Sequence, residues 1–378
     1  MHLCYVANPF SIHTRRWVRI FAERGHTITL IGVAPQRKPL EPGAFPPGVR
    51  LINFVERYNL RIVRYLLWGL MARRIVLDLK PDVLHAHQVA GDGWVAAATA
   101  YHPFITTAWG SDLLLGPRRS WVQRQLARWV LRSADAVTCV SSQLAEAARM
   151  LGADPERVTV AHWGIDTRIY SAGPADADLR RQLAPGLGPV ILSIRALKPV
   201  YNPLTLAQAI PGVLKQYPAA RFIIRTYAAD SEILRQFQEL VASSGAANNV
   251  TYVGELADES SIAALYRLAD IAVSIPVSDG TPISVLEAMA CGAAPIVSDL
   301  PSLKEWIDDG GNGLFVPVGE APALTEAIVQ LLRAPQLREQ FRQRNQEIIQ
   351  TRANQTVEMA KMETLYQQLC QSQRKRSA

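Results

Sequence analysis

Short runs of β-branched and apolar residues alternate with amphipathic segments along most of this 378-residue chain. Such runs are typical of buried strands, and the segments between them have the period of helices. The strands predicted in the first half are residues 3–7, 28–33, 83–87, 104–108, 136–140 and 158–161. Those predicted in the second half are residues 190–194, 221–227, 250–253, 271–275, 294–298 and 314–316. Strands that alternate with helices predict parallel sheets, so the fold class is α/β with two doubly wound domains.

A segment rich in Gly, Pro, Ala and Asp, residues 171–189, separates the two sets of strands. It has no strand pattern and is interpreted as an interdomain linker with a short helical piece. Residues 335–373 form a long helical pattern with many Gln and Arg. In open parallel sheets ligands bind beyond the carboxyl ends of the strands, so the loops after the strands are where chemistry is expected.

The composition is that of a globular protein, with 49% hydrophobic and 19% charged residues, which excludes disordered and fibrous chains. The four cysteines lie far apart without a C-x-x-C pair, and we interpret them as free thiols in a reducing cytoplasm. No signal peptide is expected at the first strand. No apolar run reaches the roughly 20 residues of a spanning helix, so we expect nothing to cross a bilayer.

Positive charge is concentrated in the first half. Residues 1–170 carry 21 Lys and Arg against 12 Asp and Glu, whereas residues 171–378 carry 19 against 21. Segments 57–74 and 118–132 mix arginines with Trp and aliphatic residues, a pattern typical of helices on anionic membrane surfaces. An ordinary core-facing helix with an arginine-rich outer face is an equal alternative. Nucleic-acid binding is a third and weaker alternative, because no recognition motif accompanies the positive charge.

The segment 277–317 is the most informative one. A predicted strand is followed by a Gly-containing turn and a helix, with Thr281 as its predicted cap, Pro282 at its first position and Gly292 just past its end. A helix N-terminus after a strand binds anions, and diphosphate is the natural candidate. Asp279 and Glu287 bracket this turn. No D-x-D pair accompanies them, so we do not expect a metal site; two such carboxylates suit hydrogen bonds from sugar or ribose hydroxyls. The alternative is that the pair is only a helix cap and a surface Glu.

Asp279-x7-Glu287, together with LEAMACGAAPIVSD and GGNGLFVP, resembles the E-x7-E region of the retaining family-4 glycosyltransferases of GT-B fold, the glycosyl transferases group 1. Residues 158–170, the strand VILSIR at 190–195, and Leu365-Tyr366 near the end extend the resemblance over nearly the whole chain. It is weakest over residues 35–80. It implies two Rossmann-like domains facing across a cleft: an acceptor domain of residues 1–170 with a crossover helix at about 358–378, and a donor domain of residues 171–357.

The resemblance also implies roles on the donor side. Glu287 would bind the ribose, and Asp279, one methylene shorter than the usual Glu, would contact the hydroxyls of the donor sugar. Backbone near the sugar, diphosphate and base is expected at Gly280, Thr281, Pro282, Ile283, Ser284, Gly254, Glu255 and Leu256.

Two cations are expected to hold the diphosphate as it leaves with growing charge. Arg195 stands one position early for the family's Arg, and Tyr201 or Asn202 stands where its Lys is expected. Lys198 is the substitute, and a solvated loop charge is the alternative for both Arg195 and Lys198. The implied transfer needs no metal and no other cofactor, retains the anomeric configuration, and lets a diphosphate oxygen take the acceptor's proton.

On the acceptor side we single out His13, His87, Trp109 and Asp112. Trp109-Gly110-Ser111-Asp112 stands where the family often has His-Gly-x-Asp. Tryptophan accepts no proton but can stack on a sugar. Asp112 either binds the acceptor or orients its loop, and His13 either faces the cleft or bonds backbone at a helix start. His85 is expected in the core, and no third ligand supports a metal at the histidine pair. The missing G-x-G-x-x-G argues against a nicotinamide site.

The resemblance and these residues together favour a hexosyltransferase that uses a nucleotide sugar, UDP- or GDP-linked, with UDP preferred. The expected acceptor is a polysaccharide precursor or a lipid-linked molecule of the cell envelope, met peripherally at the inner face of the cytoplasmic membrane, with no nucleic acid as partner. A nucleotide-sugar 2-epimerase on the same fold and a non-catalytic sugar-nucleotide-binding relative are the alternatives.

Overall fold

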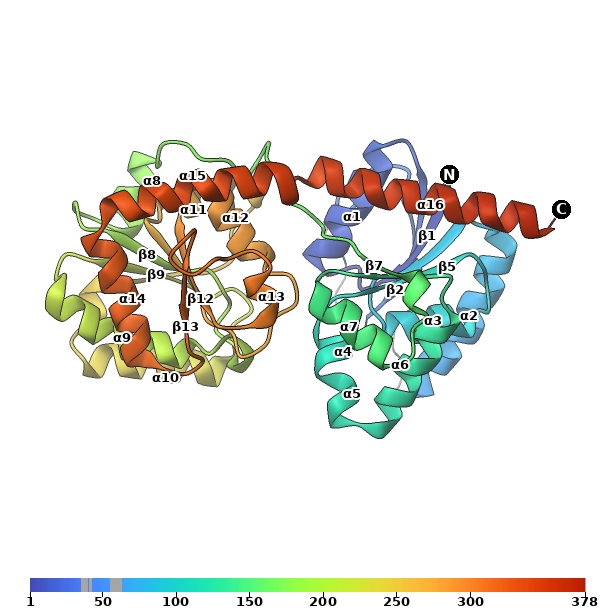
Figure 1. Ribbon diagram of the computed structural model, residues 1–378, viewed down its shortest axis with the longest axis horizontal. Helices are drawn as coiled ribbons and strands as arrows, with labels where there is room; N and C mark the ends of the chain where they lie inside the picture. Colours follow the sequence, from blue (N-terminus) through green and yellow to red (C-terminus); the bar gives the residue numbers. More distant parts are fainter. Residues whose placement is uncertain (35–39, 41–42, 55–62, 378) are drawn as a thin grey trace. The chain divides into compact units, whose positions relative to one another are not determined.

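The computed structural model describes residues 1–34, 40, 43–54 and 63–377 (Figure 1). The chain divides into two compact units, Met1–His162 with Met359–Ala378, and Trp163–Glu358. Residues 163–170, placed at the end of the first domain by sequence, therefore belong to the second unit. Both units have an all-parallel sheet flanked by helices. The predicted α/β fold class is confirmed.

The first unit has a seven-stranded sheet in the order β3-β2-β1-β4-β5-β6-β7. The strands are β1 (His2–Ala7), β2 (Thr27–Val33), β3 (Arg50–Phe54), β4 (Val83–Ala86), β5 (Phe104–Ala108), β6 (Ala136–Cys139) and β7 (Val158–Val160). The helices are α1 (Ile12–Glu23), α2 (Val63–Leu79), α3 (Asp92–Ala98), α4 (Ser111–Leu114), α5 (Gly116–Arg119), α6 (Trp121–Ser133), α7 (Ser142–Met150) and most of α16 (Gln355–Ser377). Strand β3 was not predicted. It is the edge strand and only partly buried, so its hydrophobic pattern is weak.

The second unit has a six-stranded sheet in the order β10-β9-β8-β11-β12-β13. The strands are β8 (Val190–Ser193), β9 (Arg221–Arg225), β10 (Val250–Val253), β11 (Ile271–Ser274), β12 (Ala294–Ser298) and β13 (Leu314–Val316). The helices are α8 (Ala177–Leu183), α9 (Pro203–Gln216), α10 (Ser231–Ser243), α11 (Glu259–Leu268), α12 (Ile283–Cys291), α13 (Pro301–Lys304), α14 (Ala321–Arg333) and α15 (Pro335–Arg352). Every strand predicted in this half is present.

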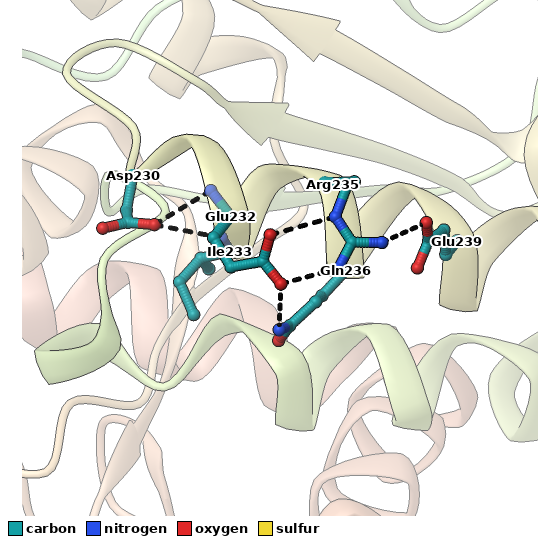
Figure 2. A network of polar contacts seen from close by, with 6 residues as sticks. All are labelled: Asp230, Glu232, Ile233, Arg235, Gln236 and Glu239. Carbon is teal, nitrogen blue, oxygen red and sulfur yellow. Dashed lines mark hydrogen bonds and ion pairs between the residues drawn. The ribbon is translucent and has the colours of Figure 1, made fainter.

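Helix α10 shows how local sequence begins a helix in this unit (Figure 2). The Asp230 carboxylate accepts hydrogen bonds from the backbone N–H groups of Glu232, at 3.0 Å, and Ile233, at 3.1 Å. One turn later Arg235 forms ion pairs with Glu232 and Glu239. These side chains are more than half exposed. The ion pairs therefore give the Arg235 guanidinium partners for its N–H groups without burying any charge.

The crossover from the second unit to the first depends on a close backbone contact. The Ile165 N–H donates to the Ala353 carbonyl at 2.6 Å, and the Gln355 N–H donates to the Ile165 carbonyl at 3.1 Å. Gly164 permits this approach, because a Cβ there would lie 2.4 Å from the Gln355 Cα. Glycine also suits its φ of +68°.

Helix α16 packs onto the first unit through polar anchors. Glu363 accepts from Arg24 at 2.7 Å and pairs with His26 at 2.8 Å. The Tyr366 hydroxyl accepts from the Trp17 indole N–H at 3.3 Å and lies 2.8 Å from His85 Nδ1. The predicted core position of His85 is confirmed, since its ring is 1% exposed. The C-terminal helix is thus an integral part of the first unit.

All four cysteines are free thiols, as predicted, and three of them are buried. Among the helices that the structure describes, none combines the length and the apolar character that a membrane crossing requires.

Candidate active site

Most of the predicted donor residues follow β8 and β11, the adjacent strands at which the strand order of the second sheet reverses. Arg195 follows β8, and the loop after β11 carries Asp279 and leads into α12. Both loops leave the carboxyl ends of their strands. This is the topological switch point at which open α/β sheets bind ligands.

Arg195 is the centre of the contacts at this switch point. Its guanidinium forms an ion pair with Asp279, and its Nη1 donates to Ser284 Oγ at 3.1 Å. The Arg195 Cζ also lies 4.7 Å from the ring centroid of Tyr201. The side chains of Arg195 and Asp279 are each 13% exposed. Their mutual attraction is therefore less screened than that of a surface pair.

The loop around Asp279 is fixed by two further hydrogen bonds. The Gly280 N–H donates to Asp279 Oδ1 at 2.9 Å, and the Ser302 hydroxyl donates to the Asp279 carbonyl at 3.0 Å. The first bond fixes the Asp279 carboxylate and the second fixes its main chain, just before the N-terminus of α12. Ser302 comes from a different helix, α13, and no local sequence signal pointed to it.

Helix α12 begins differently from the prediction. Its N-cap residue is Pro282, and no side chain caps it, so the predicted cap at Thr281 was wrong by one residue. Pro282 precedes the first helical residue, Ile283, whose N–H donates to the Thr281 carbonyl at 2.9 Å. The other end is as predicted, with Gly292 in the left-handed conformation at φ +101°.

Glu287 lies on the buried side of α12 and is only 5% exposed, so the alternative of a surface Glu was wrong. The Tyr266 hydroxyl, from α11, donates to Glu287 Oε2 at 3.2 Å. Burial raises the pKa of Tyr266 well above its ordinary value, and the nearby Glu287 carboxylate raises it further. The tyrosine therefore stays protonated and orients the carboxylate. Sequence reasoning missed Tyr266, because it lies on another helix and belongs to no motif.

The remaining donor-side residues are more exposed. Lys198 is exposed, and none of the described carboxylates forms an ion pair with it. Gly254 and Glu255 follow β10 and are exposed, while Leu256 is half-buried and packs against the core that holds Tyr266. All three residues are thus at least partly exposed beside the end of β10.

In the first unit the four predicted acceptor residues cluster beyond β1, β4 and β5. Trp109 connects them: its ring centroid lies 5.8 Å from that of His13 and 5.7 Å from that of His87. Trp109 and His13 are half-buried. The three rings come from the segments that follow three neighbouring strands, with His13 in the first turn of α1, so the sheet brings together residues that are far apart in sequence.

Asp112 orients this cluster. Its carboxylate accepts hydrogen bonds from the backbone N–H groups of Gly110 at 2.7 Å, Val89 at 3.0 Å and Trp109 at 3.1 Å. Burial raises the pKa of Asp112, and these hydrogen bonds oppose the shift. Of the two predicted roles, the contacts match the orientation of the loop that carries Trp109.

His87, one of the predicted acceptor-side residues, is deeply buried. The ring is 1% exposed and contacts the rings of Tyr5, Trp17 and Trp109. Burial lowers the pKa of His87 to about 3, so the ring is neutral. The two tryptophans that contact it, Trp17 and Trp109, come from segments far apart in the sequence.

No group of three or more His, Cys, Asp or Glu side chains is arranged to hold a metal ion within the described ranges.

The comparisons with known proteins match both units. The model of the glycosyl transferase 4-like family matches residues 2–141, and that of glycosyl transferases group 1 matches residues 176–348. A phosphatidyl-myo-inositol mannosyltransferase of Mycobacterium leprae is 27% identical over 71% of this chain and 69% of its own length. A GDP-mannose-dependent alpha-(1-6)-phosphatidylinositol monomannoside mannosyltransferase of Mycobacterium tuberculosis is 25% identical over 83% and 82%.

Solved structures agree on the fold. A sucrose-phosphate synthase from Thermosynechococcus elongatus has a TM-score of 0.84 at 19% identity, covering 98% of this chain and 100% of its own. HepE from Anabaena, solved with UDP and glucose, has a TM-score of 0.80 at 19% identity, with 97% and 99% covered. With one family model on each unit and this fold throughout, the chain belongs to the glycosyl transferases group 1 family and is a glycosyltransferase of GT-B fold.

Proposed function

We propose that this enzyme transfers a hexose from a nucleotide-diphosphate sugar, UDP-linked rather than GDP-linked, to a lipid-linked or polysaccharide-precursor acceptor. The observation that carries the proposal is the contact of Arg195 with Asp279 and Ser284 at the switch point of the second sheet. A cation, a carboxylate and a helix N-terminus meet there. A nucleotide diphosphate sugar needs these groups for its phosphates and hydroxyls.

The donor roles follow from charge and burial. Glu287, buried and oriented by Tyr266, is suited to accept hydrogen bonds from two ribose hydroxyls. Asp279 is suited to the sugar hydroxyls, and Arg195 to the diphosphate, whose charge grows as the bond to the sugar breaks. HepE holds UDP, whereas the name of the M. tuberculosis relative specifies GDP-mannose. Uracil and guanine nucleotides are therefore both included in the experiment below.

The proposed transfer retains the anomeric configuration and needs no metal ion. The acceptor oxygen bonds to the anomeric carbon as the bond from that carbon to the diphosphate oxygen breaks, and the acceptor's proton passes to the diphosphate. Trp109 stacks on a sugar and takes no proton. In this proposal His13 and Trp109 contact the acceptor molecule. The His87 ring packs against Trp109, and the Asp112 carboxylate holds the backbone of the loop that carries Trp109.

The acceptor is proposed to be presented at an anionic membrane surface. Two relatives are named for phosphatidylinositol acceptors. In α6 the buried face is Ala127, Val130 and Leu131, whereas Trp121 is 73% exposed and Trp129 is 37% exposed. Exposed tryptophans beside arginines favour the membrane over an ordinary arginine-rich outer face. The first part of the other basic segment, residues 57–62, lies outside the described residues.

The test is a thermal-shift series with UDP-glucose, UDP-galactose, UDP-N-acetylglucosamine and GDP-mannose. A ligand of the native state raises the melting temperature by mass action, so we expect a rise with at least one UDP-sugar. NMR of the products should then show slow hydrolysis to the retained anomer, at an unchanged rate in EDTA. Binding without release of sugar would indicate a non-catalytic relative, and an epimerised nucleotide sugar would indicate an epimerase. No shift with any donor would contradict the proposal.

A further inference from the structure

Arg225 is a buried cation without a counter-ion. It ends strand β9 and is 4% exposed, and its Nε is buried without a hydrogen-bond partner. Within the ranges that the structure describes, no carboxylate forms an ion pair with its guanidinium. The guanidinium lies against the ring of Tyr227, whose centroid is 4.6 Å from the Arg225 Cζ. A charged residue at the end of the otherwise apolar run RFIIR was a signal that sequence reasoning passed over.

The strand places this side chain toward the nucleotide residues. Successive residues of a strand alternate between faces. Ile224 packs in the core cluster of one sheet face, and Ile223 packs in the other, which contains Tyr266 of α11 and Leu286 of α12. Arg225 therefore shares the face of Ile223, on which α12 also carries Glu287.

Electrostatic effects agree with this placement. Burial raises the pKa of Tyr227, and the charges of Arg195 and Arg225 oppose that shift. Arg225 has the same effect on the pKa of Tyr266, whereas Glu287 raises the pKa of both tyrosines. Arg225 and Glu287 therefore both lie near Tyr227 and Tyr266, and Arg195 lies near Tyr227.

The site offers few other cations for a second contact with the diphosphate. Arg195 is already neutralised by Asp279, and Lys198 is an exposed loop residue. The family's lysine position holds Tyr201 or Asn202. A buried guanidinium with no anion is unfavourable in the free protein, because desolvation is not offset by pairing. An anionic ligand would supply the missing partner.

We propose that Arg225 is a further donor-binding residue, whose guanidinium binds an oxygen of the phosphate next to the ribose. The inference rests on the proposed function, since it takes the ligand to be a nucleotide diphosphate. The phosphate next to the ribose is chosen because Arg225 shares its neighbours with Glu287, the proposed ribose-binding residue. Arginine suits the site because its planar fork donates two hydrogen bonds to a phosphate.

The experiment measures calorimetric affinity for UDP, GDP and UMP in the wild type and three variants. Arg225→Met keeps the bulk and removes the charge, and Arg225→Lys restores a charge without the fork. Arg235→Met is the matched control, because it removes the same charge from an exposed, already paired guanidinium (Figure 2). We expect Arg225→Met to weaken UDP and UMP binding about 10- to 100-fold, Arg225→Lys to recover part of this, and Arg235→Met to change it less than about two-fold.

A purely structural role would give a different result. If Arg225 only held the Tyr227 loop, Arg225→Met would lower the melting temperature of the free protein. Under the proposal that temperature stays equal or rises, since an uncompensated buried charge has been removed. Unchanged UDP affinity in Arg225→Met, with normal binding by the wild type, would overturn the role of Arg225 alone. A wild type that binds neither UDP nor GDP would overturn the proposed function, and this inference with it.

Discussion

Arg195 and Asp279 form an ion pair in the second unit, although the proposed function gives each a separate part of the donor. The Arg195 guanidinium has five N–H donors, so it can keep Asp279 and still donate to a phosphate. Asp279 likewise keeps lone pairs for sugar hydroxyls. The pair therefore positions both groups before the donor arrives, and the loss of either one displaces the other.

Arg195→Ala should lower kcat about 10²- to 10³-fold while weakening UDP-sugar affinity less, because the growing charge of the leaving diphosphate loses its stabilising cation. Steady-state kinetics combined with calorimetry would separate the two effects. In a double-mutant cycle, Asp279→Asn should lower kcat by a smaller factor in the Arg195→Ala background than in the wild type, since its ion-pair partner is already missing. Equal losses in kcat and affinity would mean that Arg195 binds the ground state and the transition state alike.

Glu287→Ala should weaken UDP affinity by about 10- to 100-fold, because two hydrogen bonds to the ribose from a buried carboxylate are lost. Tyr266→Phe removes only the hydroxyl that orients Glu287, and a smaller loss of a few-fold is expected. The measurement is calorimetry with UDP and with 2′-deoxy-UDP. The two ligands should differ in the wild type and become alike in Glu287→Ala. An unchanged preference for UDP would remove Glu287 from the ribose site.

Much of the fold could be predicted from sequence because it rests on local pattern. The predicted strands appear where β-branched runs lie between amphipathic segments, and Gly292 ends α12 in the left-handed conformation. Strand β3 escaped prediction because an edge strand is half-buried and needs no continuous apolar run. The cap of α12 was misplaced because Thr281 and Pro282 both satisfy the local preferences, and the loop from β11 decides between them.

The candidate site was predicted as a list of residues but not as a set of contacts. The Arg195–Asp279 pair joins residues 84 positions apart, and the Tyr266–Glu287 hydrogen bond joins residues 21 positions apart. Both depend on how strands and helices pack, which no local pattern contains. The burial of His87 has the same origin, since Tyr5, Trp17 and Trp109 cover it from separate segments.

Charge reversal of Arg124 and Arg128 to Glu should reduce sedimentation with vesicles that contain phosphatidylglycerol, because each basic residue near an anionic surface contributes about 1 kcal/mol. Binding should fall by at least about ten-fold and should weaken with added salt in the wild type. Arg342→Glu, on α15 of the second unit, is the control for a simple change of net charge. Equal sedimentation of all variants would favour the ordinary outer-face interpretation of α6.

Gly164→Ala should destabilise the second unit strongly. Its φ is +68°, and a Cβ would lie 2.4 Å from the Gln355 Cα, so the crossover backbone would have to move. Gly245→Ala is the matched control, with a φ of +75° and open space around the new Cβ. We expect about 1 kcal/mol for Gly245→Ala from the left-handed conformation alone and about 3 kcal/mol or more for Gly164→Ala. Equal urea midpoints would show that the crossover accommodates the methyl group.

Acid should destabilise the first unit through its buried histidines. Burial lowers the pKa of His87 to about 3, and that of His85 well below its ordinary value. Between pH 6.5 and about 3 the unfolded chain therefore binds protons that the folded chain does not. Stability is retained above pH 6.5 and falls with decreasing pH, by up to about 1.4 kcal/mol per pH unit for each histidine.

The raised pKa values of Asp92 and Asp112 act in the opposite direction, because a folded carboxyl group that is protonated more readily stabilises the fold as the pH falls. They are present in the wild type and in His87→Asn alike, so the difference between the two proteins isolates the histidine. Urea unfolding at pH 7.5, 6.0 and 5.0 should show a shallower fall for His87→Asn than for the wild type. If the free energy of unfolding fell equally with pH in both proteins, His87 would accept a proton in the folded state. The inference that its ring is buried in the neutral form against Trp109 would then be wrong.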